Sequence, residues 1–123
     1  MHIDYALLCE FSTVSSNGLH SFMHVFDKTT FKADSPMGVR GILAAKFSEV
    51  PAEAELEVYL TDENNVVLEK GRLMKAKVKG PITQAVLRFA LPVPRAGVYT
   101  FWARMEGGEP MRLVQWTAEE KGA

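Results

Sequence analysis

His20 and His24 have the spacing of a zinc-ligand pair, and they are the first residues whose types could do chemistry. On a helix, a His-x3-His spacing puts both imidazoles on one face. The surrounding residues alternate as in a strand, however, and four residues of strand span about 13 Å. Two ligands that each lie about 2 Å from one zinc ion do not bridge that length. We therefore expect partly exposed strand residues here and no metal site.

Cys9 is the only cysteine of the chain and could act as a nucleophile beside a histidine. A hairpin would bring His20 or His24 near it on the adjacent strand. On the same side of an alternating strand, however, Cys9 has Leu7 and Phe11 as neighbours, and free cysteine in such surroundings behaves as a small buried hydrophobe. A reactive thiol needs an accessible, electropositive setting. The sequence favours a buried, unreactive Cys9.

Four consecutive side chains carry oxygen atoms, Asp62-Glu63-Asn64-Asn65. Calcium needs six to eight oxygen ligands, and the sequence shows no second acidic loop that would complete such a set. Asp and Asn are common in turns because their side chains hydrogen-bond to nearby backbone. We expect a hairpin turn here. We also expect no organic cofactor, because the chain has no glycine-rich phosphate loop.

Basic residues concentrate in one stretch: Lys70, Arg72, Lys75, Lys77 and Lys79. Alternation puts the last three on one face of a strand, where contact with phosphates is possible. No aromatic residues interleave with them, so nucleic-acid bases would have nothing to stack on. Glu53, Glu55 and Glu57 can neutralise them, and lysines also keep exposed sheet edges from pairing with other chains. A solvated edge strand is favoured over a binding patch.

Composition indicates an ordinary soluble domain. The chain has 123 residues, 47% of them hydrophobic, and a formal net charge of −1, which argues against a dedicated binder of nucleic acid or anionic membranes. A single cysteine excludes a disulfide-stapled scaffold, and the N-terminal residues lack the features of a signal peptide. We expect one cytoplasmic domain over residues 1–123, with a frayed polar tail at 118–123.

Alternating apolar residues predict strands through most of the chain. The first two, residues 3–14 and 19–27, should form a hairpin, because Asn17-Gly18 readily supplies the two positive φ angles of a tight turn. Residues 29–37 are predicted to be a loop or crossover. Later strands are expected at 56–60, 66–69, 73–79 and 85–91, with a bend at Gly71.

Residues 38–49 fit an apolar stripe on either a helix or a strand. Ala44-Ala45 favours the helix, whereas Gly41 in its middle would cost about 1 kcal/mol. The neighbouring segments are all predicted strands, and local choices in natural sequences agree with the global fold. We therefore expect a strand here.

Gly97-Val98-Tyr99 is typical of the corner before the penultimate strand of immunoglobulin-like sandwiches. There, the tyrosine hydroxyl bonds back to the upstream backbone. The inward side of this strand would then be Tyr99, Phe101 and Ala103. A two-residue turn at Gly107-Gly108 would end the strand.

The last hairpin would place Tyr99 opposite Trp116 and Phe101 opposite Val114, and such pairs contribute about 0.2–1 kcal/mol each. In total, eight or nine short strands are expected. They predict an all-β fold, a two-sheet antiparallel β-sandwich with immunoglobulin-like or related topology.

Three stretches together carry a family resemblance: Tyr5–Phe11, the Asn17-Gly18 hairpin that ends in Val25-Phe26-Asp27, and Pro92–Phe101. They resemble a family of short bacterial all-β proteins described only as a domain of unknown function. The resemblance implies a compact β-sandwich in a bacterial cytoplasm. It brings no catalytic residues with it.

Two classes of function stay open. A non-enzymatic interaction module would self-associate or dock a protein through an edge strand, or through Trp102 with Met111 and Leu113, if that face is exposed rather than core. The alternative is a small ligand-binding or hydrolytic sandwich with a loop site near Cys9, His20 and His24, or near Asp34 and Asp62. No nucleophile, base and orienting group can be assembled from these positions, so the interaction module is favoured.

Overall fold

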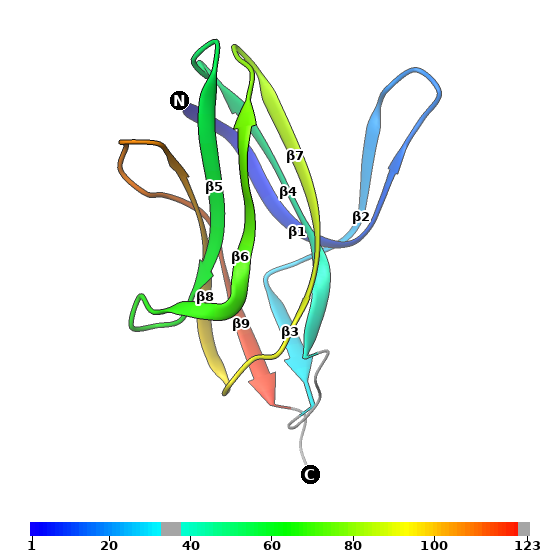
Figure 1. Cartoon of the computed structure of the whole chain (residues 1–123). Coiled ribbons are helices and arrows are strands. Elements are labelled where there is room, and N and C mark those ends of the chain that lie inside the picture. The colour runs from blue at the N-terminus through cyan, green and yellow to red at the C-terminus, as the bar shows by residue number, and fades with distance from the viewer. Residues whose placement is uncertain (33–37, 121–123) are drawn as a thin grey trace.

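The computed structural model describes residues 1–32 and 38–120, and these residues form nine strands and no helix (Figure 1). The strands are β1 (His2–Val14), β2 (His20–Phe26), β3 (Lys28–Phe31), β4 (Val39–Ser48), β5 (Ala54–Thr61), β6 (Val67–Val78), β7 (Thr83–Leu91), β8 (Gly97–Met105) and β9 (Met111–Glu120). Within these ranges, no helix is long and apolar enough to cross a membrane.

The strands form two sheets, with the orders β2-β1-β4-β7 and β3-β9-β8-β5-β6. Neighbouring strands are antiparallel, except that β3 runs parallel to β9. The predicted all-β sandwich of two sheets is confirmed. So is the prediction that residues 38–49 form a strand, because β4 is a central strand and pairs with both β1 and β7.

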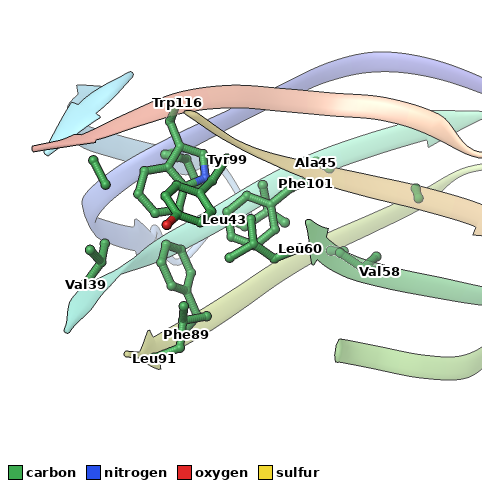
Figure 2. Close-up of a cluster of buried hydrophobic side chains, with 14 of the residues drawn as sticks. Val39, Leu43, Ala45, Val58, Leu60, Phe89, Leu91, Tyr99, Phe101 and Trp116 are labelled. Atoms are coloured by element: carbon green, nitrogen blue, oxygen red, sulfur yellow. The ribbon is translucent and has the colours of Figure 1, made fainter. Parts of the chain in front are cut away.

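One hydrophobic core joins the inner faces of the two sheets (Figure 2). Alternation turns every second residue of β5 and β8 inward. These inward residues are Leu56, Val58, Leu60, Tyr99, Phe101 and Ala103, each at most 1% exposed. Phe89 of β7 meets Phe101 with the ring centroids 5.2 Å apart. Full burial of a large apolar side chain stabilises the fold by about 1.5–3 kcal/mol, so this layer holds the sheets together.

The corner before β8 has the predicted geometry. The Tyr99 hydroxyl donates to the backbone oxygen of Arg95 at 2.6 Å, which fixes the chain as it enters the strand. Gly97, at φ 156°, lies so close to Glu63 that an added Cβ would collide with the carboxylate. That carboxylate accepts a hydrogen bond from the backbone N–H of Val98 at 2.9 Å.

The last hairpin has the predicted pairs, but its turn differs. Tyr99 lies opposite Trp116, and Phe101 lies opposite Val114. The turn is closed by the hydrogen bond from Gly108 N to Met105 O, so it is centred one residue earlier than Gly107-Gly108. A register shift after Phe101 absorbs the difference.

Two segments predicted to be irregular are strands. Lys28–Phe31, which overlaps the expected loop at 29–37, pairs with β9, and Phe31 is 5% exposed; residues 33–37 lie outside the described part of the chain. Ala118–Glu120, expected to fray, are the end of β9 that pairs with β3. Ala118 turns inward and is 1% exposed, so one residue of the segment expected to fray is buried. Residues 121–123 lie outside the described part of the chain.

The predicted strands 66–69 and 73–79 are one strand, β6, that bends sharply near its start (Figure 1). Lys70 has a φ of 62° at the bend, and the register with β5 shifts nearby. Gly71 is buried there, and an added Cβ would collide with the backbone oxygen of Leu68. The bend was therefore predicted correctly, but the pairing continues through it.

Candidate functional site

The last residues of β1 and most of β2 form a two-stranded arm that leaves the two layers of the sandwich (Figure 1). We define the arm as residues 10–25. Within it, every residue is exposed except Ser12 and Phe22, which are half-buried. β2 pairs with β1 alone and is the edge strand of its sheet. The predicted first hairpin is thus present, but it stands away from the core.

The tip of the arm is a longer turn than predicted. Gly18 N donates to Ser15 O at 2.9 Å, and Ser15 N donates to Leu19 O at 2.8 Å. Gly18 has a φ of 82°, whereas Asn17 does not adopt a positive φ. This pattern is a three-residue loop with a glycine bulge, so only one of the two expected left-handed positions is used.

Large apolar side chains are concentrated on the arm. They are Phe11, Val14, Leu19, Met23 and Val25, which are 45–64% exposed. Phe11 pairs directly with Met23, so the two side chains point to the same side. In the rest of the described chain, only Val66 and Ile82 are comparably exposed large hydrophobic residues. The arm is therefore the main exposed apolar surface in the described part of the chain.

His20 and His24 are both exposed on the arm. The Nδ1 atom of His24 lies 3.1 Å from Oε2 of Glu10, and the ring of His20 stacks on Phe22 with centroids 6.0 Å apart. The two histidines therefore have different partners. Among the described residues, no three His, Cys, Asp or Glu side chains are grouped so that they could hold a metal ion.

Cys9 is completely buried at the base of the arm, as the sequence predicted. It lies opposite Val25 on β2 and Ile42 on β4, and burial raises the pKa of its thiol. His20 lies opposite Val14 at the far end of β1. The structure does not bring Cys9 and His20 together as a nucleophile and base.

The acidic stretch forms the predicted turn between β5 and β6. The carboxylate oxygen Oδ1 of Asp62 accepts hydrogen bonds from Asn64 N at 2.8 Å and Val66 N at 3.0 Å. Its other oxygen lies 3.9 Å from the Arg95 guanidinium. This carboxylate is thus used by the turn itself. Asp34, the other acidic residue of the alternative loop site, lies outside the described residues.

The basic stretch lies on β6, the outer strand of the five-stranded sheet. Lys75 lies 3.8 Å from Glu55, and Arg72 lies 3.1 Å from Glu57. Both glutamates belong to β5. The predicted solvated edge, partly neutralised by neighbouring carboxylates, is therefore what the structure shows.

A cup of about 440 Å³ opens on the outer face of the same sheet. The centre of the cup is formed by the residues of β5 that alternate with its buried leucines. Residues of β6 and β8 form its sides. The chemically important lining residues are Glu57, Tyr59, Thr61, Arg72, Trp102 and Arg104. The strand register places Tyr59 between Arg72 and Trp102. Sequence reasoning missed this cup, although the alternation of β5 and β8 contained the signal.

Trp102 lines the cup and does not form the predicted face with Met111 and Leu113. The register shift puts Trp102 opposite Arg112, and it puts Met111 opposite the inward-pointing Ala103. Leu113 is half-buried against the core. Trp102 is itself half-buried, so it is neither fully in the core nor part of a broad apolar patch.

No family model matches the chain, and no curated protein is significantly similar to it.

Proposed function

We propose that the protein is a non-enzymatic interaction module that associates with a second copy of itself through the arm. The observation that carries this proposal is the concentration of exposed apolar side chains on a ribbon of two strands. Such a ribbon alone is only marginally stable in water. A partner that covers Phe11, Met23 and Val25 would remove their apolar surface from water and favour association.

The free edge of β2 supports the same proposal. From His20 to Phe26 it contains no Lys, Arg, Asp, Glu or Pro, which are the residues that usually prevent edge strands from pairing with other chains. His24 bends the strand with a φ of 58°. Backbone pairing with a partner is therefore expected on either side of this bend rather than through it.

The charge of the arm favours a second copy as the partner. From residue 10 to residue 25, Glu10 is the only carboxylate and no Lys or Arg is present. Glu10 already lies 3.1 Å from His24. A strongly charged partner would find little complement here, whereas two largely apolar arms, each with a single carboxylate, can meet in a two-fold interface that uses the same patch twice.

The location and relatives of the protein belong to the same proposal. A buried free thiol is compatible with a reducing compartment, and we place the protein in the cytoplasm on that ground. Membership of the bacterial family of unknown function stays a prediction that rests on the three sequence stretches alone.

A lysine placed on the arm tests the proposal. Met23→Lys should weaken self-association at least tenfold, because a charge would have to be buried in the interface. The matched control is Ile82→Lys, which alters a 58% exposed residue outside the arm. Analytical ultracentrifugation over a concentration series measures both. A wild-type chain that stays monomeric throughout, or equal effects of the two variants, would contradict the proposal.

A further inference from the structure

We infer that the cup on the outer face of the five-stranded sheet binds a small organic anion that carries a flat ring. Its volume of about 440 Å³ lies in the range of ordinary small-molecule sites. Glu57 orients two arginines at the cup, and Thr61 orients Trp102. Binding at the cup does not depend on the proposed self-association, because the arm lies on the other sheet.

Glu57 is a buried charge that holds two guanidinium groups at the cup. It is 8% exposed, and its two oxygens lie 3.1 Å from Nη1 of Arg72 and 3.3 Å from Nη2 of Arg104. Arginine has five N–H donors, so each guanidinium keeps donors that Glu57 does not use. The side chains of Arg72 and Arg104 are 63% and 47% exposed, and their remaining donors can reach a ligand.

The charge of the cup favours an anion. One carboxylate, Glu57, faces two guanidinium groups in its lining. Arg112 lies directly opposite Trp102 on β9 and adds a further positive charge on the same face. A neighbouring hollow that also includes Arg104 is lined by three carboxylates, Glu55, Glu57 and Glu106, and by Lys75. The excess positive charge is thus on the Trp102 side, and arginine forks suit carboxylate and phosphate groups.

The aromatic residues define the rest of the ligand. The indole Nε1 of Trp102 donates to Oγ1 of Thr61 at 2.8 Å, which fixes the ring and uses its only donor. What Trp102 still offers is apolar ring surface, and Tyr59 adds a second ring beside it. Val67 and Pro110 add apolar groups to the lining, and Asn65 adds a polar one. Flat rings pack favourably on such surfaces.

Binding of naphthalene-2-carboxylate tests this inference, and 1-naphthyl phosphate tests whether phosphate serves as well as carboxylate. In a ¹H–¹⁵N NMR titration, the indole N–H signal of Trp102 should shift. The signal of Trp116 should stay in place, because that residue is 1% exposed in the core. Naphthalene-2-methanol lacks the anion and cyclohexanecarboxylate lacks the flat ring, so both should bind more weakly than naphthalene-2-carboxylate.

Arg72→Gln should weaken binding of naphthalene-2-carboxylate about tenfold, because a hydrogen bond to a charged group is lost. The matched control is Lys77→Gln, which removes an exposed cation from the same strand but outside the cup. The inference is overturned if the wild-type protein does not bind the carboxylate, if the alcohol binds equally well, or if the two variants behave alike.

Discussion

The outer strands β2 and β6 are both sheet edges, but their compositions are opposite. β6 carries Glu69, Lys70, Arg72, Lys75 and Lys77, whereas β2 contains no Lys, Arg, Asp or Glu. A row of charged side chains makes pairing with another strand costly, because these charges would lose water. The difference fits the proposal that a second copy associates through the β1–β2 arm and not through β6.

The charges of β6 also position side chains on the outer face of the sheet. They form ion pairs with carboxylates of β5, such as the contact of 3.1 Å between Arg72 and Glu57. This arrangement orients side chains around the cup. On the two proposals above, one edge of the molecule would serve a small ligand on its face, and the other would serve a second copy of the chain.

Removing charges from β6 should have the largest effect on the difference in self-association between the β2 and β6 edges. In the double variant Lys75→Thr/Lys77→Thr, β6 would lose much of its protection and become a second self-association surface. A chain with two such surfaces forms open assemblies rather than closed dimers. Static light scattering should show particles that grow with concentration. Lys32→Thr, which removes an exposed lysine outside β6, should show no growth; growth in that control, or none in the double variant, would contradict the protective role.

A smaller effect is expected from a single carboxylate. Glu57→Gln should lower the free energy of unfolding by about 1–2 kcal/mol, because it leaves two arginines without their shared partner; their exposure moderates the loss. Glu10→Gln breaks only the exposed contact with His24 on the arm and should change stability by less than about 0.5 kcal/mol. Urea unfolding of the two variants compares them directly. Equal losses would mean that the Glu57 pairs contribute no more than an ordinary surface ion pair.

Alternation was sufficient to predict the sandwich but not the arm. Leu7, Cys9 and Phe11 continue one period-two pattern along β1, yet Cys9 is 0% exposed and Phe11 is 53% exposed. The pattern shows which side chains share a face. It does not show which face of the strand packs on the second sheet. Leu8, on the other face of β1, belongs to the core between the two sheets, whereas Cys9 and Phe11 do not.

The cup escaped prediction for a related reason. Glu57, Tyr59 and Thr61 were visible as the outward side of the clearest strand. Their neighbours depend on the sheet order and on the register shift that moves Trp102 opposite Arg112. A bulge leaves little trace in a sequence, because it inserts one residue without breaking the apolar pattern on either side. The expected Trp102 face therefore had the wrong members.

Cys9 offers a test of how firmly the arm is attached at its base. Burial raises the pKa of its thiol above the ordinary value near 9.0, so the folded state binds the thiol proton more tightly than the unfolded state does. This contribution to stability is fully present below about pH 9 and is lost as the pH rises through the raised pKa. The wild-type protein should therefore lose stability relative to Cys9→Ala as the pH rises from neutral to above 9.0. Tyr99, whose pKa is also raised by burial, is present in both proteins and cancels in the comparison.

At neutral pH, iodoacetamide should label Cys9 far more slowly in the folded protein than in urea, because reaction needs an exposed thiolate. Rapid labelling of the folded protein would mean that the base of the arm opens readily. The β2 edge would then differ from the β6 edge in the stability of its attachment as well as in its composition.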